Sequence, residues 1–185
     1  MCNCGEAKRE TKIINGVDTE VNEYPWMVKI LSNGCGGSII SPFHILTAAH
    51  CRPNSDLRVL IGEHDLGDSH ESETQTIPVT EILRHPDYED HPLRAADIAI
   101  LILAWPITYS TSAAPICLPA STSSLYTGQV ATLTGWGAVD NWNTWNSSGG
   151  LNDYPDILQE VQLTVVSNTK CNGTYVEYGY RGIDR

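Results

Sequence analysis

His50 stands in a context that suits proton transfer. It closes the apolar stretch Leu46-Thr47-Ala48-Ala49 and is followed at once by Cys51. A lone histidine is most often a surface residue or a hydrogen-bonded core residue. Here, however, two alanines leave little bulk beside the ring, and a positioned imidazole is the usual general acid or base of enzymes.

Asp97 is the second candidate, in Ala95-Ala96-Asp97-Ile98-Ala99-Ile100-Leu101. An acid at the head of a strand is most often a turn or edge residue. The segment that follows is nearly continuous in apolar residues, so the carboxylate lies at the border of a buried core. Burying an unpaired charge is costly, and a histidine ring nitrogen is a natural partner. We therefore expect Asp97 and His50 to meet.

Cys51, next to His50, could link this segment to Cys35, which lies in Gly34-Cys35-Gly36-Gly37-Ser38. A disulfide that closes a loop of this size contributes about 3 kcal/mol. It would also fix the backbone that carries the imidazole, and catalytic geometry tolerates little slack.

The elements that must position these residues are short strands, because a helical period is almost absent from the chain. β-Branched and aromatic runs alternate with Gly, Pro, Asn and Ser, a pattern typical of an antiparallel barrel or sandwich. The expected strands are Met27–Leu31, Gly37–Ile40, His44–Thr47, Leu57–Ile61, Thr74–Val79, Ile98–Leu103, Gln129–Gly135 and Leu158–Val165.

Other segments connect these strands. One helical turn is expected at Thr47–Arg52 and another after Ser167, where Ser, Asn and Thr offer caps. The Pro-flanked stretch Trp105–Pro119 is interpreted as a connector between two halves. Asp140–Pro155, rich in Asn, Gly, Ser and Trp, is interpreted as a long exposed loop.

Composition excludes several classes of protein. The 185 residues carry a formal charge of −11, which makes nucleic acid an unsuitable partner because phosphate binding needs clustered Lys and Arg. No apolar run reaches the length of a membrane span, so no membrane partner is expected. The six cysteines lack the paired CxxC spacing of a zinc ribbon.

Cysteine usage together with two sequons indicates the secretory route. Asn146-Ser147-Ser148 and Asn172-Gly173-Thr174 are candidate glycosylation sites. We expect an extracellular location in an oxidising compartment. The chain has no N-terminal signal peptide, which suggests that Met1 is not the true start of the protein.

The chain resembles the chymotrypsin/trypsin-like serine proteases. The resemblance rests on motifs that recur in order from Ile13 to about Gln162: Ile13-Ile14-Asn15-Gly16, Tyr24-Pro25-Trp26, Cys35-Gly36-Gly37-Ser38, Leu46 to Cys51, Asp97-Ile98-Ala99 and Thr134-Gly135-Trp136-Gly137. It implies an all-β fold of two antiparallel barrels, the second incomplete in this chain. It further implies an activation-segment remnant (1–12) and a peptidase domain (13–185), divided into an N-terminal barrel (13–104), a connector (105–119) and a partial C-terminal barrel (120–185).

The resemblance assigns roles to individual residues. His50 would be the general base, and Asp97 would hold its tautomer and stabilise the imidazolium. The Lys12–Ile13 bond looks like the activation cleavage site of a zymogen. The implied activity is endopeptidase cleavage of a protein or peptide substrate by acyl transfer, without a redox or organic cofactor. Protease inhibitors would be further partners.

The nucleophile of that mechanism is not found in the chain. No Gly-Asp-Ser-Gly-Gly occurs, and Ser148, in Asn146-Ser147-Ser148-Gly149-Gly150, has ordinary loop composition. The chain therefore looks C-terminally truncated, and these residues alone should be inactive. The alternative is a non-catalytic homologue that acts as a binding or regulatory module. His50 and Asp97 favour the enzyme, because a binding module needs neither.

The resemblance also bears on the remaining cysteines. Cys117 resembles the cysteine that tethers the activation segment, with Cys4 or Cys2 as its partner and Cys4 favoured because a glycine follows it. Cys171 resembles a cysteine whose partner lies past Arg185. Ala131 stands where many relatives carry another cysteine.

The loop Glu63–Glu73, which also holds Asp65, Asp68 and Glu71, is rich in acids. In trypsin-like relatives this loop can hold a structural Ca²⁺, a hard cation that prefers oxygen ligands. A solvated acidic turn is the more ordinary interpretation.

Overall fold

A computed structural model defines the fold over most of the chain. It describes residues 4–7, 16–31, 34–51, 56–68, 73–88, 96–120, 125–138 and 154–177.

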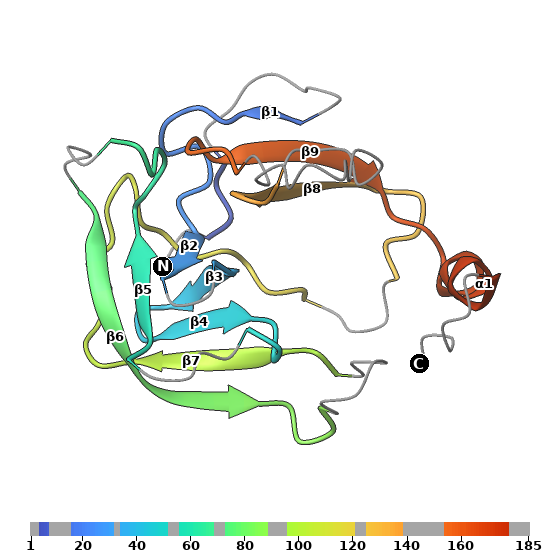
Figure 1. Cartoon of the computed structure of the whole chain (residues 1–185), viewed down its shortest axis with the longest axis horizontal. Helices are drawn as coiled ribbons and strands as arrows, with labels where there is room; N and C mark the ends of the chain where they lie inside the picture. The colour runs from blue at the N-terminus through green and yellow to red at the C-terminus, as the bar shows by residue number, and fades with distance from the viewer. Residues whose placement is uncertain are drawn as a thin grey trace, which may run out of the picture.

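Six antiparallel strands close into a barrel, seen in the lower left of Figure 1. Around the ring the order is β2-β3-β4-β7-β6-β5. Hairpins join β2 to β3, β3 to β4 and β5 to β6, whereas β7 returns between β4 and β6 to close the ring. The strands are β2 (Met27–Ile30), β3 (Gly36–Ser41), β4 (His44–Thr47), β5 (Arg58–Ile61), β6 (Gln75–Arg84) and β7 (Ala99–Leu103).

The barrel closes because alternate residues of its strands are branched and apolar and point inward. Side chains at these positions are almost completely removed from water, and each contributes about 1.5–3 kcal/mol of burial free energy. The interior is filled by Val28, Ile30, Ile39, Ile45, Val59, Ile61, Ile77 and Leu101.

A second, smaller sheet lies beside the barrel (Figure 1). Its order is β1-β9-β8, formed by β1 (Val17–Asp18), β9 (Gln159–Thr164) and β8 (Val130–Gly135). β1 falls within the range expected for the N-terminal barrel, but it pairs with β9 of the second sheet. A two-residue strand is too short to produce an alternating pattern, so no alternation marks it in the sequence.

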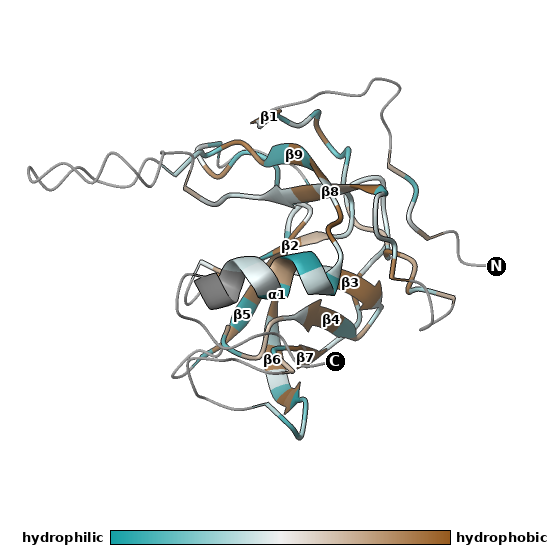
Figure 2. Cartoon of the chain, turned by 90° about the vertical axis from the view of Figure 1, so that its right-hand side faces the viewer, coloured by the Kyte–Doolittle hydropathy of each residue, from teal (hydrophilic) through white to brown (hydrophobic). Residues whose placement is uncertain are grey.

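One helix follows the second sheet. α1 (Asn168–Glu177) begins after Ser167, whose hydroxyl oxygen accepts a hydrogen bond from the Lys170 amide at 3.2 Å. This is the expected N-cap. Figure 2 views the molecule with α1 toward the reader and the barrel strands behind it. In the described part of the chain, no helix is both long and apolar enough to cross a membrane.

The stretch 105–119 contains no strand and runs along the barrel. Its backbone amides at Ile107, Ala114 and Ile116 donate hydrogen bonds to barrel-side carbonyls, at 2.8, 3.0 and 2.9 Å. The Cys4–Cys117 disulfide ties the N-terminal segment to it. The connector is therefore held in place by backbone bonding, although it has no regular structure.

Strands are present at each expected position, with ends that differ by at most one residue except in β6. That strand continues to Arg84, five residues past its expected end. A register shift between Val79 and Glu81 lets β6 curve along β7. Polar residues interrupt the alternating apolar pattern in this part of β6, but its pairing with β7 continues to Arg84. The architecture is the all-β chymotrypsin-type fold, with one closed barrel and a partial second sheet.

Candidate active site

The pairing of β4 with β7 brings the two candidate catalytic residues together. Thr47, the last residue of β4, lies opposite Ala99, the first residue of β7. Because the strands are antiparallel, the segment leaving β4 and the segment entering β7 emerge at the same end of the barrel. His50 lies three residues beyond that point and Asp97 two residues before it.

Asp97 binds His50 through both carboxylate oxygens. Oδ2 is 2.6 Å from ring Nδ1, and Oδ1 accepts a hydrogen bond from the His50 backbone amide at 2.8 Å. The side chains are 39% and 23% exposed, so the pair lies at the surface of the barrel end. One carboxylate thus fixes both the ring and the backbone that carries it.

Local turns set the positions of both His50 and Asp97. After β4 the chain makes a tight turn, in which the Cys51 amide donates to the Ala48 carbonyl at 3.1 Å. Before β7, Ala96 has a φ of 53°, in the left-handed region, and its carbonyl accepts from the Ile98 amide at 2.7 Å. A non-glycine residue rarely adopts this conformation, and such strain tends to be found at functional sites.

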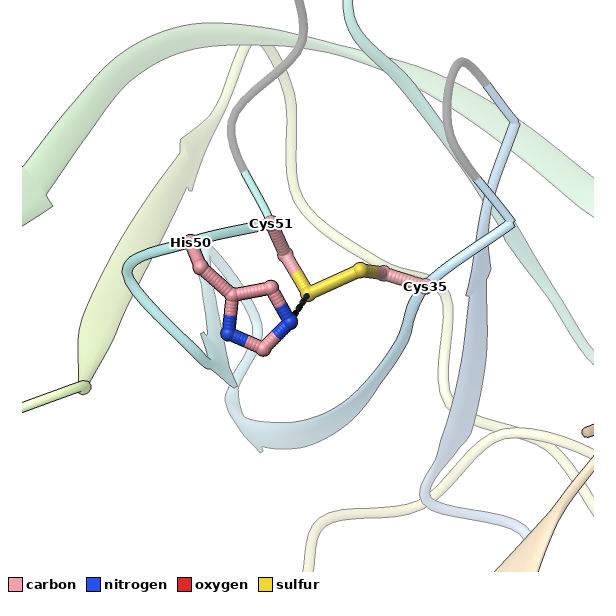
Figure 3. A group of neighbouring side chains, drawn as sticks. All are labelled: Cys35, His50 and Cys51. Carbon is pink, nitrogen blue, oxygen red and sulfur yellow. Dashed lines mark hydrogen bonds between the residues drawn. A yellow bond between two sulfur atoms is a disulfide. The ribbon is translucent and has the colours of Figure 1, made fainter. Parts of the chain in front are cut away.

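The Cys35–Cys51 disulfide is formed beside the imidazole, with an S–S distance of 2.04 Å. Figure 3 shows the ring with Nε2 directed at this bond, 3.6 Å from Cys51 Sγ. Among the described residues, Cys35, His50 and Cys51 are the one group of three potential metal ligands close enough to share an ion. Sulfurs joined to each other are not thiolates, so this state is not a metal site.

The arrangement defines a tautomer. A carboxylate can only accept a hydrogen bond, so Nδ1 carries the proton and Nε2 keeps its lone pair. A ring held in this way can take a proton at Nε2 while Asp97 stabilises the resulting imidazolium. This is the chemistry of a general base in acyl transfer.

The other residues singled out from the sequence lie elsewhere. Lys12, Ile13, Cys2 and Asn146 fall outside the described residues. Cys4 and Cys117 form a disulfide with an S–S distance of 1.99 Å. Cys171 is a free thiol, and Asn172 lies on α1 near it.

Two acids of the acidic loop accept hydrogen bonds from protein groups. A Glu63 oxygen accepts from the His64 amide at 3.3 Å, and Glu73 Oε2 accepts from the Ser112 hydroxyl at 3.3 Å. Glu71 lies outside the described part. In that part this loop forms no cluster of three carboxylates close enough to share an ion. The Ca²⁺ site therefore stays a prediction.

A buried polar cluster between the barrel and the second sheet was not predicted from the sequence. The Tyr24 hydroxyl donates to Glu160, and Glu160 and Glu23 are 5% and 1% exposed. Burial, reinforced by the hydrogen bond to Glu160 and the nearby charge of Glu23, raises the pKa of Tyr24 far above its ordinary value of 10.0. Glu160 lies on β9, opposite Val17 of β1, and Glu23 and Tyr24 follow β1 in the chain.

The barrel, the adjoining sheet and the His50–Asp97 pair together define the chymotrypsin-type class of serine hydrolases. A comparison with family models agrees, since residues 13–183 match the model for Trypsin. The chain belongs to the trypsin family.

Individual relatives support this assignment. The chain is 36% identical over 187 residues to the venom serine protease of Polistes dominula, covering 94% of this chain. It is 33% identical to ovochymase-2 of Mus musculus over 87% of the chain, and 31% identical to the serine protease filzig of Drosophila melanogaster over 91%. The matched region spans 62%, 26% and 10% of the lengths of these three relatives.

Proposed function

We propose that the full-length protein is a secreted serine endopeptidase, made as a zymogen and activated by cleavage after Lys12. The observation that carries this proposal is the two-point contact of Asp97 with His50, at 2.6 Å to Nδ1 and 2.8 Å to the backbone amide. Two of the relatives are named as serine proteases, which supports the same proposal.

In the proposed reaction, His50 works through Nε2. A serine hydroxyl attacks the carbonyl carbon of the scissile peptide bond and gives its proton to Nε2. The imidazolium, stabilised by Asp97, then passes that proton to the leaving amine, and an acyl-enzyme remains. Water enters by the same route, with Nε2 again as base, and releases the acid product.

We propose that the serine and the backbone amides that stabilise the oxyanion follow Arg185, because residues 1–185 contain no Gly-Asp-Ser-Gly-Gly. The outer part of the second sheet is consistent with further strands. Val130, Leu133 and Leu163 are 64%, 61% and 53% exposed. Apolar side chains gathered on one small sheet gain stability when other strands cover them.

Activation is proposed at the Lys12–Ile13 bond, a basic residue followed by an apolar pair. In this family the new Ile13 amine would pair with a carboxylate beside the nucleophile and order the oxyanion hole. The Cys4–Cys117 disulfide supports this scheme, because it would keep residues 1–12 attached after the cut.

The proposal is tested with full-length protein treated with a trypsin-like activator. Cleaved protein should hydrolyse peptide substrates and react with a fluorophosphonate probe specific for activated serines. Asp97→Asn should lower kcat by about ten-thousand-fold and His50→Ala by about a million-fold, each with little change in KM. Residues 1–185 alone should be cut at Lys12 and gain no activity.

His85 and Asp87 provide a matched control. They form an exposed pair whose Nδ1 and Oδ2 atoms lie 4.0 Å apart. His85→Ala and Asp87→Asn should leave hydrolysis unchanged. Cleaved full-length protein that neither hydrolyses peptides nor takes up the probe would instead indicate a non-catalytic binding module.

A further inference from the structure

His50 touches the Cys35–Cys51 disulfide as well as Asp97. The Asp97 carboxylate holds one ring nitrogen at 2.6 Å, and the other ring nitrogen lies 3.6 Å from Cys51 Sγ. Figure 3 shows this nitrogen facing the sulfur. Carboxylate, imidazole and sulfur thus form a continuous chain of contacts, in which Nε2 faces the sulfur that becomes a thiolate when the disulfide is broken.

We propose that Cys35–Cys51 is a site of thiol–disulfide exchange, at which a dithiol attacks Cys35 and Cys51 leaves with His50 as its proton donor. The exchange itself does not depend on the proposed hydrolysis. It requires only the three side chains that the structure places together.

Burial decides which sulfur is attacked. Cys51 is 6% exposed, whereas Cys35 is only half-buried. An incoming thiolate therefore reaches Cys35 more easily. That choice makes Cys51 the leaving group, and Cys51 is the sulfur that contacts the imidazole. Exchange is faster when the leaving thiolate is stabilised.

The steps balance as follows. A thiolate of the dithiol bonds to Cys35 Sγ, the Cys35–Cys51 bond breaks, and its electron pair goes to Cys51 Sγ. His50 has first taken up a proton from solvent at Nε2, and Cys51 Sγ now takes that proton and leaves the ring neutral. The second thiolate of the dithiol attacks the dithiol sulfur that is bonded to Cys35. Cys35 then leaves as a thiolate, which takes a proton from solvent. The protein disulfide is reduced to two thiols, and the dithiol is oxidised to a disulfide.

The second disulfide has a different environment. Gly5 lies directly beside Cys117, and in the described part of the chain no histidine hydrogen-bonds to either of its sulfurs. Cys4–Cys117 therefore serves as an internal reference in the same molecule. Both disulfides meet the same reductant, so the ratio of their reduction rates does not depend on the concentration or ionisation of that reductant.

Reduction would also change the state of the imidazole. The Cys51 thiol left by the exchange can donate a hydrogen bond to Nε2 of the neutral ring. The lone pair that would accept the proton of a serine is then occupied. Reversible loss of hydrolysis on reduction rests on the proposed function, but the exchange chemistry does not.

The experiment follows both disulfides in full-length protein treated with limiting dithiothreitol. Free thiols are trapped with N-ethylmaleimide at timed intervals, and each cysteine is quantified by peptide mass spectrometry. The ratio of the Cys35–Cys51 rate to the Cys4–Cys117 rate should fall about tenfold in His50→Gln, because the proton donor is lost. Asp97→Asn should lower the ratio in the same direction, whereas the control His85→Gln should leave it unchanged.

A second readout locates the attack. Treatment with glutathione, a monothiol, should leave the mixed disulfide on Cys35 and the free thiol on Cys51. A variant that misfolds would speed the reduction of both disulfides together, and in that event Asp97→Asn carries the test. A rate ratio unaffected by His50→Gln in folded protein, or glutathione found on Cys51, would overturn the proposal.

Discussion

At the residue scale, the site depends on orientation more than on the strength of an ion pair. His50 and Asp97 are both partly exposed, and pairs in that setting contribute at most about 1 kcal/mol to stability. The second hydrogen bond, which the His50 backbone amide donates to Asp97 Oδ1, matters more because it fixes the position of the residue. Two contacts from one carboxylate leave the ring little rotational freedom, which is what catalysis by a base requires.

The buried cluster at Tyr24 makes a prediction at this same scale. Tyr24→Phe removes the hydroxyl that donates to Glu160, a side chain only 5% exposed. A buried acceptor that loses its donor costs about 1–3 kcal/mol. We expect the free energy of unfolding, measured in urea at neutral pH, to fall by about that amount. The exposed control Tyr126→Phe should change it by less than about 0.5 kcal/mol.

Tyr24 also predicts a dependence on alkaline pH. Burial and the bond to Glu160 raise its pKa above 10.0 in the folded state, so the folded protein holds the phenol proton more tightly than the unfolded chain does. The stability contributed by this proton is present below about pH 10 and is lost as the pH rises above it. The wild type should therefore lose more stability than Tyr24→Phe between pH 9 and pH 11. Equal losses in the two proteins would contradict the assignment.

At the scale of elements, the β3–β4 hairpin positions His50, the candidate catalytic histidine. Gly37 on β3 allows β4 to approach, because a Cβ there would lie 2.7 Å from Ile45 Cγ2 and 3.0 Å from the Leu46 carbonyl oxygen. Thr47 Oγ1 adds a hydrogen bond to the Gly36 carbonyl at 2.8 Å. Close packing of these strands sets where β4 ends and therefore where His50 begins its turn.

Two neighbouring glycines test this role of the hairpin. Gly37→Ala should destabilise the protein by about 1–3 kcal/mol, because the added methyl overpacks the strand contact. At Gly36 a Cβ meets nothing closer than 3.7 Å, so Gly36→Ala should cost clearly less. Thermal unfolding of both variants decides between them. Equal destabilisation would show that the close approach of β3 and β4 is not the cause.

At the scale of the whole molecule, two cross-links hold the chain in different ways. Cys35–Cys51 spans 16 residues within the barrel end, whereas Cys4–Cys117 spans 113 residues and ties the N-terminal segment to the connector. In the chain-entropy view the longer loop gives the larger constraint on the unfolded state, about 4–5 kcal/mol. That constraint exists only while the backbone between the cysteines is intact.

Cleavage after Lys12 should therefore alter the value of the long-range disulfide. In uncut protein, Cys4→Ser combined with Cys117→Ser should lower the free energy of unfolding by several kcal/mol, up to about 4–5. In cut protein the same pair of substitutions should cost much less, because the bond then links a short peptide and closes no loop. Denaturant unfolding of the four species measures this difference. An equal cost before and after cutting would mean that local contacts around Cys117 dominate.

The sequence by itself determined the fold class, the approximate positions of all strands but β1, and the candidates His50, Asp97 and Cys35. Alternating apolar residues indicate strands locally, and the motifs around His50, Asp97 and Cys35 can be recognised from the sequence alone. The tertiary structure decided how they meet. The register that sets Thr47 opposite Ala99 places His50 and Asp97 at one barrel end. The hydrogen bond of Tyr24 to Glu160, across 136 residues, also forms only when the second sheet packs against the barrel. Such contacts depend on strand pairing between distant segments, and no local pattern in the chain encodes that pairing.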